Sequence, residues 1–209
     1  MGYLHIDNLY KSQDVLLFKE VYALEKIHGT SAHVAWRDGA VHYSSGGEKQ
    51  QRFVALFDDA ALRAAFAALG HPQVVVFGEA YGGSQQGQSW RYGKALKFIA
   101  FEVKIGDSWL AVSQAAQVVA ALGLEFVPYA EVATDLPALD AERDAPSIQA
   151  RRNGVEGDVP REGVVLRPPF EVHTNNGERV IAKHKLDEER ETATSRKVVD
   201  TAALAVLAR

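Results

Sequence analysis

The stretch from Lys19 to Tyr43, "KEVYALEKIHGTSAHVAWRDGAVHY", predicts how the sheet of this chain begins. Residues 19–27 read as a strand that ends on a lysine and an isoleucine. Residues 32–43 form two alternating runs around Asp38-Gly39, which is the strongest short signal for a β-hairpin. Lys26 therefore stands between a strand and a hairpin. Because an amine is costly to bury, such a lysine either reaches water or takes part in chemistry.

Two helices are predicted further along the chain. The first runs from Asp58, the expected N-cap, to Gly70, and places Leu62, Phe66 and Leu69 on one face. The second runs from Ser113, the expected cap, to Gly123, which ends it. A third helix is expected in the tail, at about residues 187–207, where charged residues precede an apolar face.

The remaining apolar segments read as strands. They cover residues 73–83, 96–112, 161–168 and 179–186. A polar loop at residues 83–93 separates the first two. The pattern weakens over residues 128–160, of which residues 142–160 indicate a short helix at best, set among turns. Because strands and helices do not alternate regularly, the sequence favours an α+β fold of antiparallel sheets flanked by helices.

Composition limits the class of protein. The 209 residues contain no cysteine, so disulfides and cysteine-bound zinc are excluded, which fits a cytoplasmic protein. No apolar run is long enough to span a bilayer, and no secretory signal is apparent at the N-terminus. The formal charge of −4 argues against a chain that coats nucleic acid, but leaves room for a local basic groove. We expect one domain over residues 1–209.

Five charged residues interrupt the predicted strands in a fixed order. They are Lys26, Glu79, Glu162, Lys183 and Lys185. Taken singly, each is better explained as a solvated residue or as half of an ion pair. Lys183 and Lys185 are two residues apart, so on a strand both point to the same side. Their joint occurrence is harder to explain without shared chemistry.

This order resembles the covalent nucleotidyltransferase superfamily of ATP-dependent ligases and capping enzymes. The family's Lys-x-Asp-Gly motif stands here as "KIHG" at residues 26–29, which is similar to the RNA ligases of the bacteriophage nick-sealing type. The later matches are "FGEAYG" at 77–82, "FIAFEV" at 98–103, "EGVVLRP" at 162–168 and "IAKHK" at 181–185. The resemblance implies a nucleotidyltransferase core, similar to ATP-grasp folds, with an ATP pocket between two antiparallel sheets.

The resemblance implies that Lys26 forms a covalent bond to AMP. A lysine amine attacks phosphorus only when it is neutral, and its ordinary pKa of about 10.4 leaves almost none neutral at pH 7. Lys183 and Lys185, together with Mg²⁺ or Mn²⁺, would favour the neutral amine and stabilise charge on the phosphate. Glu162 is expected near the reacting phosphate, as a metal ligand.

The same resemblance assigns the nucleotide-binding residues. Glu79 is expected to hold the ribose, while Phe98 and Val165 sandwich the adenine. Glu25 and the backbone of Ile27 are expected to read the exocyclic amine of the base.

The RNA contacts are less closely specified. His28 is expected to contact the phosphates or the RNA end, or else to be structural. The segment Ser89–Lys97 interleaves aromatic and basic residues and suits nucleic acid. Arg52, Arg91 and Lys94 are the RNA-binding candidates. Ser31 stands where the nick-sealing relatives usually carry an asparagine that orients metal-bound water.

These features predict an ATP-dependent RNA ligase, an enzyme that forms phosphoric ester bonds in RNA repair. AMP would pass from Lys26 to an RNA 5′-phosphate, and a 3′-hydroxyl would then displace it. The alternatives are another acceptor (a DNA nick, a cap or a protein) or a nucleotide- or RNA-binding module without turnover. No OB-fold or helical domain is expected after Lys185, so an accessory protein is a possible partner. A bacterial or phage-encoded enzyme acting in the cytoplasm is expected.

Overall fold

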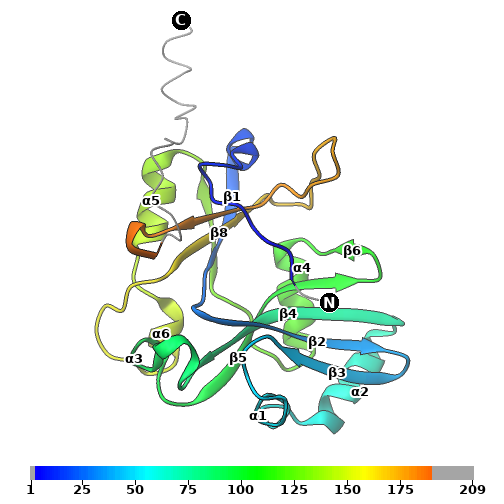
Figure 1. Ribbon diagram of the computed structural model, residues 1–209. Coiled ribbons are helices and arrows are strands. Elements are labelled where there is room, and N and C mark those ends of the chain that lie inside the picture. The colour runs from blue at the N-terminus through cyan, green and yellow to red at the C-terminus, as the bar shows by residue number, and fades with distance from the viewer. Residues whose placement is uncertain (1–2, 190–209) are drawn as a thin grey trace, which may run out of the picture. The chain divides into compact units, whose positions relative to one another are not determined.

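The computed structural model describes residues 3–189 and divides them into two compact units (Figure 1). The first unit contains Ile27–Val127 and Gln149–Gly157, together with the N-terminal residues up to Leu4. Of the described residues, the second contains His5–Lys26, Pro128–Ile148 and residues 158–189. We describe each unit by itself.

The first unit is built on a five-stranded antiparallel sheet in the order β3-β2-β4-β5-β6. Its strands are β2 (Gly29–Arg37), β3 (Ala40–Ser45), β4 (Gln73–Gly82), β5 (Leu96–Ile105) and β6 (Ser108–Trp109). The predicted hairpin is confirmed, since β2 and β3 pair around Asp38 and Gly39, whose φ angles of 53° and 71° fit a tight hairpin turn.

Helices cover one face of this sheet. The covering helices include α2 (Asp59–Leu69) and α4 (Val112–Ala121). The unit also contains α1 (Gln50–Val54), η2 (Gln85–Gly87), α3 (Ser89–Tyr92) and all but the first residue of α6 (Ile148–Arg152). Phe66 of α2 and Val119 of α4 pack with Val34 and Val76 of the sheet in one core cluster. Burial of such side chains stabilises the unit by about 2 kcal/mol for each large residue.

The ends of the two predicted helices match the structure to different degrees. The Asp58 carboxylate accepts a hydrogen bond from the Ala61 amide at 3.1 Å, and Gly70 is left-handed, as expected of a cap and a terminator. The prediction for Ser113 is wrong, because α4 starts at Val112 and its N-cap position is Ala111. Ser113 therefore lies inside the first turn of the helix.

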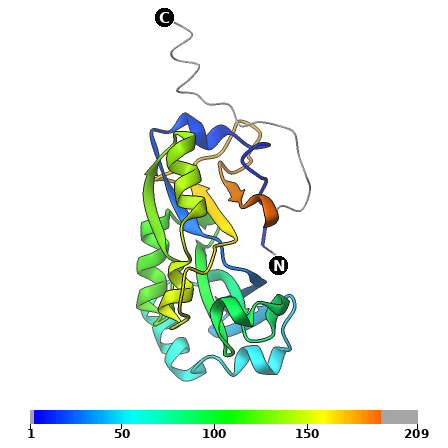
Figure 2. The ribbon, with the colours of Figure 1, turned by 90° about the vertical axis from the view of Figure 1, so that its left-hand side faces the viewer.

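The second unit contains a four-stranded antiparallel sheet in the order β7-β1-β8-β9. Its elements are β1 (Glu20–Glu25), β7 (Tyr129–Ala133), β8 (Gly163–Arg167), β9 (Ala182–Lys185), α5 (Leu136–Asp144), η1 (Asp14–Leu17) and η3 (Asp187–Glu189). Figure 2 shows α5 alongside the strands of this sheet, where Leu139 packs with Ala23, Leu166 and Ala182.

The predicted α+β class is confirmed, since two antiparallel sheets are flanked by helices. Two local predictions need correction. Residues 96–112 are not one strand, because the chain turns at Gly106 between β5 and β6. Residues 128–160 hold β7 and α5 in addition to the one short helix that was expected, α6. Of the tail helix expected at 187–207, residues 187–189 form η3, and the rest lies outside the described residues.

Across residues 3–189, none of the helices has the length and apolar character needed to cross a membrane.

Candidate active site

The ends of three strands of the second unit bring the predicted catalytic residues together. The Lys26 amide donates a hydrogen bond to the Gly163 carbonyl at 3.0 Å, and Gly163 pairs with Lys185 across β8 and β9. Val165 pairs with Lys183 two residues further along. Since side chains alternate along a strand, Lys183 and Lys185 lie on one face of this sheet, as the sequence predicted. Half-buried Val165 shares that face with them.

Glu162 lies between two lysines. One carboxylate oxygen is 2.9 Å from Lys26 Nζ, and the other is 2.9 Å from Lys185 Nζ. The side chains of Glu162 and Lys185 are 5% and 7% exposed, whereas that of Lys26 is 27% exposed. Glu162 and Lys185 are therefore shielded from solvent, and Lys26 is the most accessible residue of the three. A ligand from solvent can reach the Lys26 amine before it reaches the other two.

The electrostatics of the cluster keep Glu162 ionised. Burial by itself raises the pKa of this carboxyl, but attraction to Lys26 and Lys185 and the hydrogen bonds they donate outweigh it, so its pKa lies below the ordinary 4.5. A carboxylate with a lowered pKa is a poor proton acceptor at neutral pH. Its role in this geometry is to hold the two amines in place.

The lowered pKa of Glu162 predicts a dependence of stability on pH. A carboxyl whose pKa is lower in the folded state contributes stability that is complete above its unfolded value and is lost as pH falls through the folded value. We therefore expect the wild type to lose more free energy of unfolding than Glu162→Gln between about pH 6 and about pH 3. Urea unfolding at each pH measures the difference, and equal losses in the two proteins would contradict the ion-pair assignment.

Two glycines in the family motifs stand where the fold leaves no room for a side chain. Gly163, directly after Glu162, has a φ of +147°, and a Cβ there would lie 2.3 Å from the His184 carbonyl oxygen. In the first unit, a Cβ on Gly29 would lie 2.4 Å from the Ala80 carbonyl oxygen. Both positions therefore require glycine, because the neighbouring strand passes too close for a side chain.

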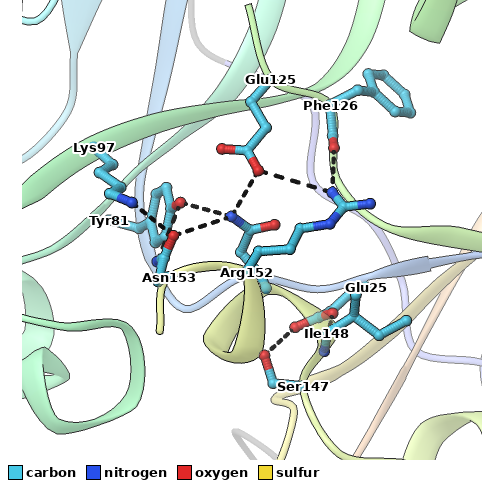
Figure 3. A network of polar contacts seen from close by, with 10 residues as sticks. Glu25, Tyr81, Lys97, Glu125, Phe126, Ser147, Ile148, Arg152 and Asn153 are labelled. Carbon is cyan, nitrogen blue, oxygen red and sulfur yellow. Dashed lines mark hydrogen bonds and ion pairs between the residues drawn. The ribbon is translucent and has the colours of Figure 1, made fainter. Parts of the chain in front are cut away.

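Glu25 points to the other face of the second unit's sheet, because it pairs with Val164 and not with Val165. Its carboxylate accepts the Ser147 hydroxyl at 2.5 Å and the Ile148 amide at 3.0 Å, as Figure 3 shows. Arg161 Nε lies 3.9 Å away. Both oxygens of Glu25 thus accept protein donors, and its expected reading of the adenine amine stays a prediction.

In the first unit, Ile27 is buried and the His28 amide donates to the Tyr92 hydroxyl at 3.3 Å. Glu79 pairs with Ser31 on β2 and with Ile99 on β5. The ribose role of Glu79 and the phosphate or RNA role of His28 stay predictions.

The structure places Phe98 on the helix-covered face of the first unit's sheet. It pairs with Ala80, which is one residue away from Glu79, so Phe98 and Glu79 lie on opposite faces of the sheet. Its ring packs edge-on against Phe53 and Phe57, at centroid distances of 5.7 and 5.5 Å. Phe98 is therefore partly buried against the apolar core of that face. The expected stacking of Phe98 on the adenine stays a prediction.

A polar network that sequence reasoning missed lies in the first unit (Figure 3). Buried Gln149 donates to the Tyr81 hydroxyl and to the Glu125 carboxylate, both at 3.0 Å. Asn153 donates to the Tyr92 carbonyl at 3.0 Å and accepts from Lys97 at 2.8 Å. The network fixes α6 and the residue after it against β4 and β5. No local sequence signal marks it, because its members are distant in the chain.

The RNA-binding candidates differ in exposure. Arg52 and Lys94 are exposed, and Arg52 pairs with Glu48 at 3.3 Å. Arg91 is only 5% exposed, and its guanidinium lies 5.0 Å from the ring of Trp90, which is 56% exposed. The aromatic ring of Trp90, and not the guanidinium of Arg91, is thus presented to solvent, and the RNA role of Arg91 stays a prediction.

Within residues 3–189, no group of three His, Asp or Glu side chains could hold a metal ion. A magnesium ion bound mainly by phosphate oxygens and water needs only one or two protein carboxylates. Glu162 fits as such a single ligand, because each carboxylate oxygen has two lone pairs and only one is needed for each lysine. Its role as a metal ligand stays a prediction.

Comparison with known proteins gives one family. A family model described as RNA ligase matches residues 19–185, which include every motif that the sequence analysis singled out. No curated protein matches the sequence.

Solved structures of Naegleria gruberi RNA ligase resemble the fold. The structure with PPi has a TM-score of 0.68 at 15% identity, covering 90% of this chain and 56% of that one. A variant with ATP and Mn has a TM-score of 0.67 at 15% identity, covering 90% of this chain and 57% of that one. A variant with AMP and Mn has a TM-score of 0.68 at 15% identity, covering 91% of this chain and 59% of that one. At this identity the likeness shows the fold alone, and this chain spans just over half the length of those proteins.

Proposed function

The chain belongs to the RNA ligase family, and from this premise we propose that it carries the nucleotidyl-transfer core of an ATP-dependent RNA ligase. The observation that supports the proposal most strongly is the Lys26–Glu162–Lys185 cluster, in which both carboxylate oxygens lie 2.9 Å from a lysine amine. The most accessible amine of the cluster belongs to the residue that opens the "KIHG" motif.

In the first proposed step, Lys26 becomes adenylylated. Its amine gives up a proton to solvent, and its nitrogen then attacks the α-phosphorus of ATP. A phosphorus–nitrogen bond forms, the bond to the bridging oxygen breaks, and pyrophosphate leaves. Glu162 orients the amine toward its target. Lys183 and Lys185 stabilise the negative charge that shifts toward the leaving group.

In the second proposed step, an oxygen of an RNA 5′-phosphate attacks the phosphorus of lysyl-AMP. The phosphorus–nitrogen bond breaks, the amine of Lys26 is restored, and a 5′–5′ pyrophosphate is left on the RNA. In the third step an RNA 3′-hydroxyl attacks that 5′-phosphate, loses its proton, and displaces AMP to form a phosphodiester. Magnesium or manganese, held by Glu162 and phosphate oxygens, would supply positive charge against the triphosphate.

The choice of ATP and of RNA rests on the family and on the relatives. The family model is described as RNA ligase, and the similar Naegleria structures are titled with ATP, AMP and Mn. Since this chain spans just over half of those proteins, we propose that sealing RNA, as distinct from self-adenylylation, draws on an accessory protein or a further segment. The cysteine-free sequence is consistent with action in the cytoplasm of a bacterium or phage-infected cell.

The proposed acceptor is tested with a nicked RNA duplex. We expect ATP and Mg²⁺ to give adenylylated RNA, and then joined RNA, when the nick carries a 5′-phosphate, and neither product when it carries a 5′-hydroxyl. Gel separation of end-labelled strands measures both products. A protein that becomes adenylylated but transfers no AMP to RNA, while it adenylylates a nicked DNA duplex, would overturn the assignment of RNA as the acceptor.

A further inference from the structure

Each catalytic residue of the second unit has a polar neighbour in sequence whose side chain points to the opposite face of the sheet. Glu25 precedes Lys26, Arg161 precedes Glu162, and His184 lies between Lys183 and Lys185. The register places Glu25 and His184 on that face, since Glu25 pairs with Val164 and Val164 pairs with His184. Arg161 lies before β8, and its Nε is 3.9 Å from the Glu25 carboxylate. Glu25, Val164 and His184 are each one residue away from the residues on the catalytic face, so their side chains point to the opposite face of the sheet.

The buried guanidinium of Arg161 makes several hydrogen bonds and ion pairs. Its side chain is 3% exposed, and it donates to the Pro146 carbonyl at 3.1 Å and to the Glu142 carbonyl at 2.9 Å. It also pairs with the Glu142 carboxylate and lies 3.9 Å from Glu25. A buried guanidinium with three hydrogen-bond acceptors and a second carboxylate nearby has little freedom, so the backbone that leads into Glu162 is fixed in place.

Glu25 is fixed in the same way at the end of β1. Ser147 and the Ile148 amide donate to its two oxygens at 2.5 and 3.0 Å, and Figure 3 shows both contacts. The Glu25 amide also donates to the Pro128 carbonyl at 2.8 Å. The residue directly before Lys26 therefore has its side chain and its backbone anchored.

His184 connects the lysine strand, β9, to the middle and the last turn of α5. Its Nε2 is 2.7 Å from an Asp140 carboxylate oxygen and 3.1 Å from Arg143 Nη1. Arg143 in turn pairs with Asp140 at 2.8 Å and with Asp144 at 2.6 Å. The side chain of His184 is 6% exposed, whereas that of Asp140 is 45% exposed, so the contact runs from the buried strand to the surface of α5.

We propose that Arg161, Ser147 and Asp140 are positioning residues, which set the geometry of the Lys26–Glu162–Lys185 cluster from the opposite face of the sheet. Each acts through a neighbour in sequence of a catalytic residue: Arg161 adjoins Glu162 directly, Ser147 acts through Glu25, and Asp140 acts through His184. The inference rests on the proposed function, in which that cluster performs the adenylylation. Displacement of a reacting group by a fraction of an ångström is enough to slow such chemistry.

The test compares Arg161→Lys, Ser147→Ala and Asp140→Asn with wild type in single-turnover adenylylation. We expect the rate constant at saturating ATP to fall by about tenfold in Arg161→Lys and Asp140→Asn. The ATP concentration at half-saturation should stay within about twofold for Asp140→Asn, because no contact with ATP is removed. The rate constant does not depend on how much of the sample is folded, so a merely structural role would leave it unchanged.

Arg179→Lys is the matched control. Arg179 is also a buried arginine of the second unit, with a 7% exposed side chain paired to Glu171, and it adjoins no catalytic residue. We expect it to lower the melting temperature without changing the rate constant. Should Arg161→Lys fail to fold, Asp140→Asn still tests the proposal, because the Asp140 side chain is 45% exposed.

A second readout needs no nucleotide. Trace labelling with an amine-reactive reagent, followed by peptide mass spectrometry, compares Lys26 with exposed Lys19. We expect the Lys26:Lys19 labelling ratio to rise by about threefold in Ser147→Ala and Asp140→Asn, because a less well held amine leaves Glu162 more often. Unchanged ratios and rate constants in all three variants would overturn the inference. A changed ratio in a protein that never forms lysyl-AMP would support the positioning role and contradict the proposed function instead.

Discussion

Lys26→Ala should gain no AMP from ATP under any condition in which the wild type becomes adenylylated. The variant lacks the only nucleophile of the Lys26–Glu162–Lys185 cluster that is more than a quarter exposed, and Lys185 is 7% exposed and held by Glu162. Intact mass spectrometry after incubation with ATP and magnesium measures the outcome. Lys19→Ala, which removes an exposed lysine from the same segment, is the control and should become adenylylated like the wild type.

Lys26→Arg separates charge from nucleophilicity. A guanidinium keeps the positive charge next to Glu162 but stays protonated, so it cannot attack phosphorus. We expect this variant to fold with a melting temperature near that of the wild type and to form no covalent AMP. Covalent AMP on either Lys26 variant would mean that another residue is the nucleophile, and the motif assignment would fall.

Glu162→Ala and Lys183→Ala are expected to slow adenylylation by about 100-fold or more. Removing Glu162 leaves Lys26 and Lys185 without their shared carboxylate, so the attacking amine loses its orientation. Removing Lys183 deletes a buried positive charge on the lysine face of the sheet. Single-turnover rate constants measure the effect independently of the folded fraction.

Glu171→Ala is the matched control for Glu162→Ala. Glu171 is a carboxylate of the same unit that pairs with Arg167 and Arg179, and its pKa is likewise lowered by them against the opposing effect of burial. We expect its loss to reduce stability and to leave the rate constant near that of the wild type. Wild-type rates in both Glu162→Ala and Lys183→Ala would show that the second unit's lysine cluster is not the reacting site.

The parts of the fold and the site that were predictable from sequence depend on residues close together in the chain. The Asp38-Gly39 hairpin and the helix from Asp58 to Gly70 follow from turn and capping chemistry, which acts over a few residues. The shared face of Lys183 and Lys185 follows from the two-residue period of a strand. The meeting of Lys26 with Glu162 was indicated only by the ordered motifs of the family.

The parts that could not be predicted depend on contacts between distant segments. The face of the sheet to which Phe98 points relative to Glu79 is decided by the register of β4 against β5, which a bulge between Phe77 and Gly78 shifts, and no local pattern reveals it. Arg91 reads as a surface cation, yet the fold around α3 buries it. The polar layer around Arg161 was missed because Glu25, Glu142 and Arg161 are brought together by the sheet and not by spacing along the chain.

The central claim is that Lys26 carries AMP during the reaction. The most direct measurement is a peptide map of the protein after incubation with ATP and magnesium, with a sample treated first with pyrophosphate to remove any AMP already attached. The account predicts a single AMP, formed with ATP and not with GTP, on the peptide that contains Lys26. An AMP located on another lysine, or a pyrophosphate-treated protein that takes up none, would contradict it.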